Sequence, residues 1–142
     1  MLFRSMTWKL NNEPVTPEMI DGYYGFVYQI TDNVNRKKYI GRKYFTKAGY
    51  KTVKGKRKKI RKDSDWMDYY GSNTKLKDQV ELHGKEQFDR EILRLCKTRS
   101  ETNYYELHFQ IHCQVLLSDE WYNDWISAKI SRKHLTSLKK SV

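Results

Sequence analysis

The chain has 142 residues, about the length of a single domain with one modest core. It carries 28 Lys and Arg against 17 Asp and Glu, a formal net charge of +11, which favours a polyanionic partner and makes nucleic acid the first candidate. No apolar run approaches the roughly 20 residues of a membrane-spanning helix, and the N-terminus MLFRSMTWKL lacks the apolar stretch of a signal peptide, so we expect a cytoplasmic protein and no membrane partner.

A β-hairpin is the first clear element. Two runs with strand propensity, FVYQI and KKYIG, flank a polar segment at 31–36 that is rich in Asn and Asp. Tyr28 and Tyr39 fall one on each strand, and Arg42 and Lys43 follow the second strand closely. The hairpin is therefore expected to present two phenols and two cations to an anionic ligand.

The same residues carry a family resemblance. FVY followed by YIG, with eleven positions from Tyr28 to Tyr39, resembles the pair of short motifs that names the GIY-YIG nucleases. YIG is complete, whereas Phe26 stands where the first motif has glycine and Gly25 lies one residue earlier. The later order of YYGS, a helix ending in HG, and FDREIL resembles phage-encoded members of the homing-endonuclease type.

The resemblance implies an α/β fold of the α+β kind: a small, mainly antiparallel three-stranded sheet flanked by helices. It also implies a DNA endonuclease that hydrolyses phosphodiester bonds by in-line attack of water, uses Mg²⁺ or Mn²⁺ and no small-molecule cofactor, and acts as a monomer or transient dimer in a bacterial host cell. Tyr28 or Tyr39 is expected to position or deprotonate the water, and neighbouring cations such as Arg42 and Lys43, or the metal, are expected to lower the pKa of that phenol.

A basic tract follows the hairpin. Residues 47–62 contain nine Lys or Arg and no acid, which predicts an extended loop or ribbon that becomes ordered against a counter-charge. The tract lies directly after the motif hairpin, so contact with the DNA backbone is favoured over a solvated charge run. The predicted nucleic-acid-binding residues are Lys43, Lys56, Arg57, Lys58, Lys59, Arg61 and Lys62.

Two helices are predicted next, over 63–71 with Ser64 as N-cap and over 72–84. Many family members carry, on a helix after YIG, an Arg with His or Tyr four residues later. Tyr69 and Tyr70 are the candidates for the second role, and Tyr70 is chosen. The Arg of that pattern is absent. We therefore expect the catalytic cation to be Arg42, with Arg57 and Arg61 as the alternatives.

A third strand is predicted over 87–96, buried at Phe88 and Leu93, and a long helix over 100–115. Two apolar faces predict that this helix is covered on both sides. They are Tyr104, Leu107, Ile111 and Val115, and Tyr105, Phe109 and Cys113. Glu106 lies near the second face, where an ionised carboxylate is costly unless it is paired or holds a metal.

The resemblance makes Glu106 the metal ligand, because the family has a metal-binding glutamate on the helix after its third strand. Glu101 is the alternative, although near the helix start it has a simpler role as a partner of the helix dipole. His108 and His112 with Cys113 are a weaker zinc candidate, since nothing completes a tetrahedral shell. Cys96 and Cys113 lack CxxC spacing and are expected to be buried free thiols.

The expected organisation is an N-terminal arm over 1–23, a nuclease domain over 24–126 with a basic insertion at 46–62, and a basic C-terminal helix over 127–142 that packs on the same domain. An asparagine in a YN pair lies near the active site in the resembled family, and Asn123 matches it, so we expect it at the site; an ordinary turn or cap residue is the alternative.

Two other functions remain open from the residues. An inactive nucleic-acid-binding module on the same scaffold would explain the altered first motif and the missing Arg. A basic RNA-associated structural protein would use the tyrosines only for base stacking or for the core.

Overall fold

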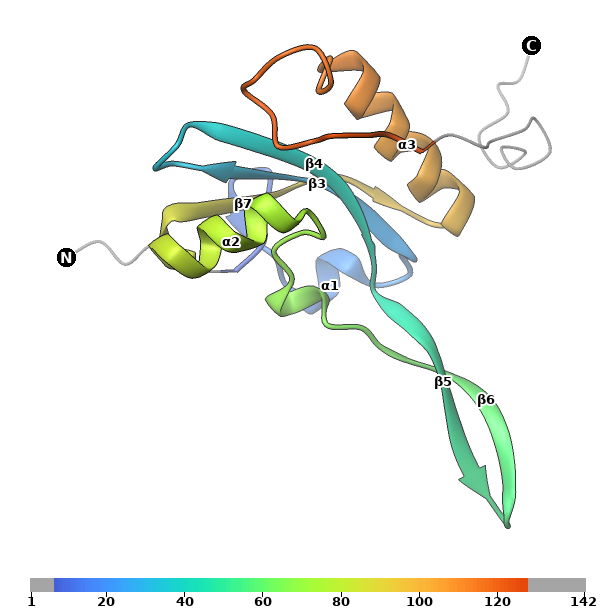
Figure 1. The fold of residues 1–142 in the computed structure, drawn as a ribbon. Coiled ribbons are helices and arrows are strands. Elements are labelled where there is room, and N and C mark those ends of the chain that lie inside the picture. The colour runs from blue at the N-terminus through green and yellow to red at the C-terminus, as the bar shows by residue number, and fades with distance from the viewer. Residues whose placement is uncertain (1–6, 128–142) are drawn as a thin grey trace, which may run out of the picture.

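The computed structural model describes residues 7–127, which form a five-stranded sheet covered on both faces (Figure 1). Helix α3 (Arg99–His112) covers one face and helix α2 (Thr74–His83) lies on the other. A two-stranded ribbon, β5 (Thr46–Val53) and β6 (Lys56–Asp63), projects away from this body. None of the helices in the described part of the chain combines the length and hydrophobicity needed to span a bilayer.

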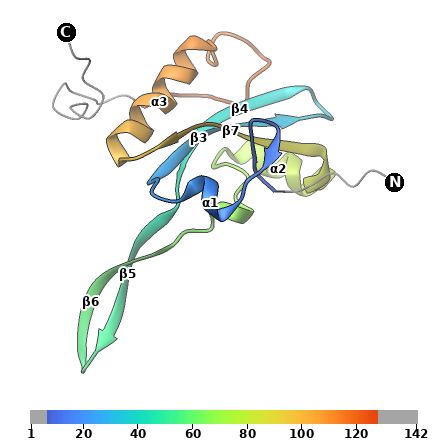
Figure 2. The same cartoon turned by 180° about the vertical axis from the view of Figure 1, so that it is seen from behind.

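The sheet has the strand order β2-β1-β7-β3-β4. The predicted hairpin is β3 (Gly25–Asp32) and β4 (Lys37–Tyr44), and β7 (Phe88–Cys96) pairs antiparallel with β3. Strand β1 (Lys9–Leu10) runs parallel to β7, with β2 (Glu13–Pro14) antiparallel to β1 (Figure 2). The α+β prediction is confirmed. The expected number of three strands is wrong, because the N-terminal segment adds two short strands. The sheet is mainly antiparallel, as expected, and the β1–β7 pair is the parallel one that makes it mixed.

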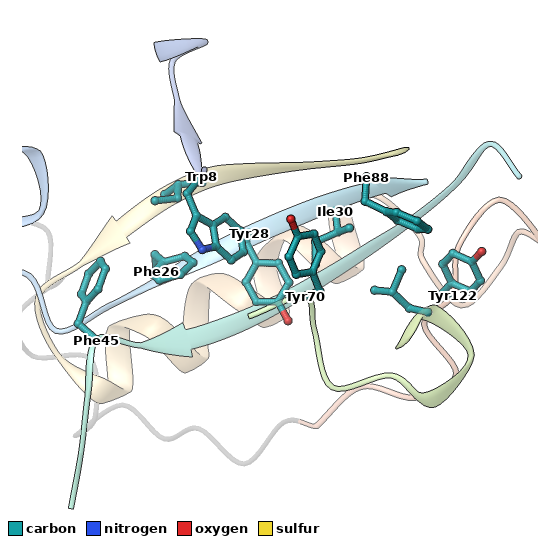
Figure 3. Close-up of a cluster of buried hydrophobic side chains, with 10 residues drawn as sticks. Trp8, Phe26, Tyr28, Ile30, Phe45, Tyr70, Phe88 and Tyr122 are labelled. Atoms are coloured by element: carbon teal, nitrogen blue, oxygen red, sulfur yellow. The ribbon is translucent and has the colours of Figure 1, made fainter. Parts of the chain in front are cut away.

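The N-terminal segment is held on the sheet by Trp8, which is 1% exposed. Its ring packs edge-on against Phe26 and Tyr28, with centroids 4.9 and 5.2 Å away (Figure 3). Its Nε1 donates a hydrogen bond to the carbonyl of Trp66 at 2.6 Å. Helix α1 (Pro17–Ile20), a single turn, then leads into β3. The described part of the expected arm is thus part of the main aromatic core.

Helix α2 confirms the helix predicted over 72–84. Asn73 Oδ1 accepts a hydrogen bond from the Leu76 backbone N–H at 3.0 Å, and Gly84 ends the helix at a φ of 89°. Leu76 is fully buried in the core, so the apolar stripe of this helix faces the sheet. A 3-10 turn, η2 (Lys85–Gln87), connects α2 to β7.

The helix predicted over 63–71 is wrong. Only one 3-10 turn forms there, η1 (Trp66–Asp68). The Ser64 hydroxyl does not cap a helix because it donates to the Tyr44 carbonyl at 2.6 Å. The loop is held instead by Arg90 of β7, whose Nη1 donates to two loop carbonyls.

Strand β7 confirms the third predicted strand, but its buried positions differ in part. Phe88 is buried as expected, together with Arg90 and Ile92 on the same face. Leu93 is only half-buried because it is the extra residue of a β-bulge. Val27 pairs with Arg94 and Tyr28 pairs with Ile92, which leaves Leu93 without a partner on β3.

Helix α3 confirms the helix predicted over 100–115, and it begins after Thr98, whose Oγ1 accepts from the Glu101 N–H at 3.0 Å. The prediction that apolar residues cover it on both sides is wrong, since Ile111 is 58% exposed. The second apolar face packs on the sheet as a half-buried layer. The deeply buried stripe is polar and consists of Thr102, Glu106 and Gln110.

The ribbon formed by β5 and β6 agrees with the predicted extended ribbon. All eight residues of each strand pair in a continuous antiparallel register. The strands are joined by Lys54 and Gly55, both at positive φ (52° and 75°), as a type I′ hairpin turn requires. Cys96 and Cys113 are free thiols, as predicted, but Cys96 alone of the two is buried and Cys113 is half-buried. Residues 128–142, which carry the expected C-terminal helix, lie outside the described residues.

Candidate active site

A pocket of about 410 Å³ opens beside β4, the outermost strand of the sheet. The segment after α3 covers the first half of that strand's outer edge: the Lys38 N–H donates to the Glu120 carbonyl at 2.8 Å, and the Tyr122 N–H donates to the Lys38 carbonyl at 2.7 Å. The pocket lies beyond this cover. Its lining includes Tyr28, Tyr39, Arg42, Lys43, Lys47, Tyr69, Ser72, Glu106, Gln110 and Asp124.

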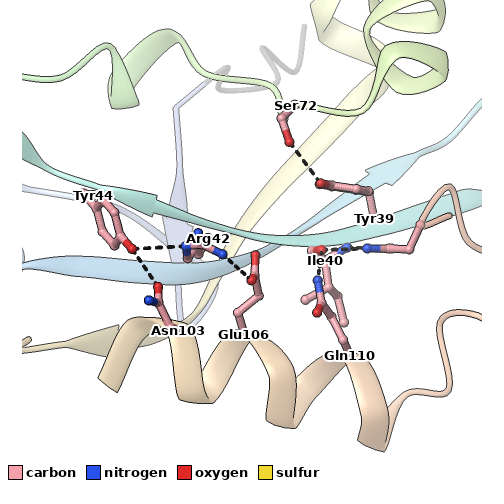
Figure 4. Close-up of polar contacts among 9 residues, drawn as sticks. Tyr39, Ile40, Arg42, Tyr44, Ser72, Asn103, Glu106 and Gln110 are labelled. Carbon is pink, nitrogen blue, oxygen red and sulfur yellow. Dashed lines mark hydrogen bonds and ion pairs between the residues drawn. The ribbon is translucent and has the colours of Figure 1, made fainter. Parts of the chain in front are cut away.

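The two motif tyrosines meet in this pocket across Gly41. Tyr28 and Gly41 are cross-strand partners, and the rings of Tyr28 and Tyr39 have their centroids 6.1 Å apart. A Cβ on Gly41 would lie 2.5 Å from the Tyr28 hydroxyl and 2.9 Å from Cε1 of Tyr39. The glycine of the YIG motif is therefore required for the two phenols to approach. The Tyr39 hydroxyl is hydrogen-bonded to Ser72 Oγ at 3.2 Å (Figure 4).

This close approach predicts that Gly41→Ala is a damaging change. The added methyl group has to displace one or both aromatic rings, which costs about 1–3 kcal/mol in a packed interior and moves the phenols by several tenths of an ångström. We expect a lower melting temperature, and a loss of about 10²-fold in any activity that depends on the phenols. Thermal unfolding measures the first effect. An unchanged melting temperature would contradict this description of Gly41.

Both phenols are protonated near neutral pH. Burial raises the pKa of Tyr28 well above its ordinary value, with Tyr69 and Tyr39 adding to the effect. Burial also raises the pKa of Tyr39; Ser72 and Arg42 oppose the rise without reversing it. Arg42 lowers the pKa of Tyr39, as predicted of a neighbouring cation, but desolvation outweighs this attraction and the net shift is upward.

Arg42 and Glu106 form an ion pair on the other side of β4. Arg42 Nη1 donates to Glu106 Oε1 at 2.6 Å, and Arg42 Nε donates to the Tyr44 hydroxyl at 3.2 Å. That hydroxyl in turn donates to Asn103 Oδ1 at 2.6 Å, so the guanidinium is held from two sides (Figure 4). Glu106 is 8% exposed; burial raises the pKa of its carboxyl group and Arg42 lowers it in part.

The donor atoms fit a hard divalent cation that substrate and water help to bind. Glu106 is the buried carboxylate of the pocket, whereas Asp65 and Asp124 are exposed and pair with lysines. One helical turn after Glu106, Gln110 Nε2 donates to the Ile40 carbonyl, which leaves its buried Oε1 without a hydrogen-bond partner among the described residues. Mg²⁺ is commonly bound by one or two carboxylates, phosphate oxygens and water, and needs no protein cage. Within residues 7–127, no three His, Cys, Asp or Glu side chains gather as a metal site.

Tyr69, the alternative to Tyr70, lies in the pocket. Its ring is 5.9 Å from that of Tyr28, and the Lys43 ammonium lies 4.0 Å from its centroid. Tyr70, the chosen candidate, is not in the pocket lining: it is buried in the aromatic core, 4.1 Å from the Arg90 guanidinium. The backbone at Tyr69 is extended, so these neighbouring side chains point in opposite directions.

Asn123 lies next to the pocket, and both its amide oxygen and its amide nitrogen are hydrogen-bonded to the backbone of Ile40. Its Oδ1 accepts from the Ile40 N–H at 3.1 Å, and its Nδ2 donates to the Ile40 carbonyl at 2.8 Å. It continues the cover of the β4 edge and holds the following residues, 124–127, against the pocket. The hydrogen bonds of Asn123 therefore position the segment after α3 against β4, and neither of them goes to Glu106.

The remaining candidates lie outside the pocket. Arg61 of the ribbon donates to Thr46 and to the Tyr24 hydroxyl, and Arg57 lies 4.0 Å from the Tyr50 ring. Lys56, Lys58, Lys59 and Lys62 lie on the same ribbon. The structure thus brings Tyr28, Tyr39, Arg42, Lys43 and Glu106 together. Sequence reasoning missed Lys47, Ser72 and Gln110; for Gln110, its position four residues after Glu106 was the available signal.

The alternative metal candidates make local contacts. Glu101 Oε2 accepts from the Lys97 N–H at 2.9 Å, as expected of a residue at a helix start. The rings of His108 and His112 are stacked 6.0 Å apart on an exposed part of α3.

Comparison with protein families matches residues 8–126 to the family described as "Putative endonuclease segE, GIY-YIG domain". The matched range contains every strand of the sheet and every pocket-lining residue except Ser127. Searches of the curated proteins and of solved structures returned no match.

Proposed function

Because this chain belongs to the segE family of the GIY-YIG nuclease superfamily, we propose that it is a divalent-metal-dependent endonuclease that hydrolyses phosphodiester bonds in DNA. One observation carries the proposal: Tyr39 and Arg42 of β4 and Glu106 of α3, which lies far from them in the sequence, line one pocket at the edge of β4. A pocket that offers a phenol, a guanidinium and a buried carboxylate suits a reaction in which negative charge grows on a phosphate.

In-line hydrolysis needs a positioned water, a held phosphate and compensation of the charge on the leaving oxygen. Tyr39, as a neutral phenol, would orient the attacking water and not deprotonate it, since burial raises its pKa. Arg42 would hold the phosphate, because a guanidinium donates two parallel hydrogen bonds to such oxygens. Glu106 would hold Mg²⁺ or Mn²⁺, which supplies Lewis-acid stabilisation of phosphate charge when bound.

The charge of the molecule supports DNA as the substrate. Lys43 lies in the pocket, and the basic ribbon starts beside it with Thr46 and Lys47 in the pocket lining. A duplex whose scissile phosphate enters the pocket would reach the ribbon and release counterions there, which favours binding. We include Lys43 and the ribbon cations in the proposed DNA-binding surface.

The test is conversion of supercoiled plasmid by the full chain in Mg²⁺, with and without EDTA. We expect turnover that EDTA stops. Tyr39→Phe removes only the hydroxyl that contacts Ser72, and we expect it to reduce cleavage by about 10²-fold or more at unchanged stability. Tyr104→Phe, on the part of α3 outside the pocket, is the matched control and should cleave normally. Full activity of Tyr39→Phe would contradict its role.

An inactive nucleic-acid-binding module is the second candidate function. It is favoured by one contact: Arg42 and Glu106 neutralise each other at 2.6 Å, so neither is free for a phosphate or a metal in this state. That function predicts DNA binding that weakens steeply with salt, and no cleavage in either Mg²⁺ or Mn²⁺. The plasmid assay separates the two functions.

A further inference from the structure

The two faces of the ribbon carry different cations. In an antiparallel pair, directly opposed residues point to the same face, and successive residues alternate between faces. The register of β5 and β6 therefore sorts the basic residues into two sets. We call one side the lysine face, which carries Lys47, Lys51, Lys56, Lys58 and Lys62. The opposite side, the arginine face, carries Arg57, Lys59 and Arg61 together with Tyr50.

Side-chain contacts agree with this division. On the lysine face, a Cβ built on Gly49 would lie 2.6 Å from Cδ of Lys62, so the stem of that lysine crosses the glycine. On the arginine face, the Arg57 guanidinium stacks 4.0 Å from the Tyr50 ring, and Arg61 is engaged by Thr46. Both arginines of the arginine face therefore have partners within the protein.

Among the described residues, no hydrogen bond, ring contact or ion pair engages a lysine of the lysine face, although Asp65 attracts the charge of Lys47 at longer range. Lys47 pairs with Lys62, and Lys51 pairs with Lys58, so like charges lie directly opposite one another, which destabilises a strand pair. All five lysines are exposed. Within residues 7–127, no ion pair joins any of them to a carboxylate. A row of unpaired lysines is stabilised by an external polyanion.

The lysine face also continues the pocket. Lys47, the first lysine of this face, belongs to the pocket lining together with Lys43 of β4. Eight residues of β-strand extend about 26 Å, which is the axial rise of about eight base pairs of a duplex. The twist of a two-stranded ribbon lets its face turn with the backbone that it follows (Figure 1).

We propose that the lysine face of the β5–β6 ribbon binds the sugar–phosphate backbone of the duplex DNA arm that leaves the pocket, and that the arginine face does not contact this arm. The inference rests on the proposed nuclease function, which supplies the DNA in the pocket. Lysine binds phosphate as a point charge, so the contact contributes affinity and position without sequence readout. This proposal adds Lys47 and Lys51 to the DNA-binding residues predicted from the sequence and removes Arg57, Lys59 and Arg61 from them.

The test compares two double variants of equal charge. Lys51→Gln/Lys58→Gln neutralises an opposed pair on the lysine face, and Arg57→Gln/Lys59→Gln removes the same charge from the arginine face. Binding of a duplex of about 30 base pairs and mixed sequence is measured in EDTA over a range of salt. Each lost phosphate contact lowers the magnitude of the slope of log K against log salt by about 0.9. We therefore expect this slope to fall by about 1.8 in the lysine-face variant, and the variant to bind the duplex more than about tenfold more weakly than wild type. The arginine-face variant should match wild type.

Equal losses in the two variants would overturn the face assignment and leave the nuclease proposal intact. A wild-type chain that binds duplex DNA, with the larger loss in the arginine-face variant, would reverse the assignment. A wild-type chain that does not bind duplex DNA at all would overturn the proposed function as well. All four substituted side chains are exposed, so thermal unfolding should be unchanged and serves as the folding control.

Discussion

Glu106→Ala is expected to lose DNA cleavage by about 10³-fold or more while the protein keeps its fold and its affinity for DNA. Glu106 is the buried carboxylate of the pocket and the partner of Arg42, so its removal takes away the proposed metal ligand. The stability effect should be small. The substitution relieves the cost of burying a carboxylate, and the Arg42 side chain is 36% exposed and can reach water. Plasmid cleavage in Mg²⁺ and thermal unfolding measure the two effects.

Glu106→Gln is the matched control, because it keeps the size of the side chain and an acceptor for Arg42 but loses the charge. If the carboxylate holds a metal, Gln should be as inactive as Ala. If Glu106 only positions Arg42, Gln should retain most of the activity. Nicking retained by Glu106→Ala would remove this residue from the site altogether.

The sequence predicts the parts of the fold that local signals determine. The hairpin β3–β4 follows from two strand-forming runs around a polar turn, and α2 from an apolar stripe at helical spacing and a terminal glycine. Strand β1 could not be predicted in this way: it has two residues and pairs with β7, some 80 positions away. Short elements made by distant pairing carry little local pattern.

The same distinction applies to the site. The positions of Tyr28, Tyr39 and Arg42 follow from the hairpin alone, and Glu106 from the family resemblance. The choice between Tyr69 and Tyr70 depends on how one loop docks, because neighbouring residues of an extended segment face opposite ways. The polar buried stripe of α3 was missed because an amphipathic pattern assumes an apolar partner, whereas Gln110 faces a backbone carbonyl at the edge of β4.

Arg90→Met is expected to destabilise the protein by about 3 kcal/mol or more, the largest stability effect that we predict. Arg90 is 4% exposed, and its Nη1 donates to the carbonyls of Met67 and Tyr69, each at 2.9 Å. Its guanidinium lies 4.7 Å from the Trp8 ring and also stacks on the neighbouring Tyr70 ring. Methionine fills much of the space but leaves two backbone carbonyls without that donor, and each such loss costs about 1–3 kcal/mol. For a chain of this length the melting temperature should fall by about 10 °C.

Arg94→Met is the control on the same strand, since Arg94 is exposed and its guanidinium lies 3.8 Å from the Tyr105 ring. This substitution should lower the free energy of unfolding by less than about 1 kcal/mol. The two variants also test the link from core to pocket. The loop that Arg90 holds carries Tyr69 into the pocket, so Arg90→Met should lose cleavage even at temperatures where the variant is fully folded. Arg90→Lys should recover stability only in part, because an ammonium group lacks the planar fork of the guanidinium. If Arg90→Met unfolds no earlier than Arg94→Met, the two carbonyl contacts do not hold this loop.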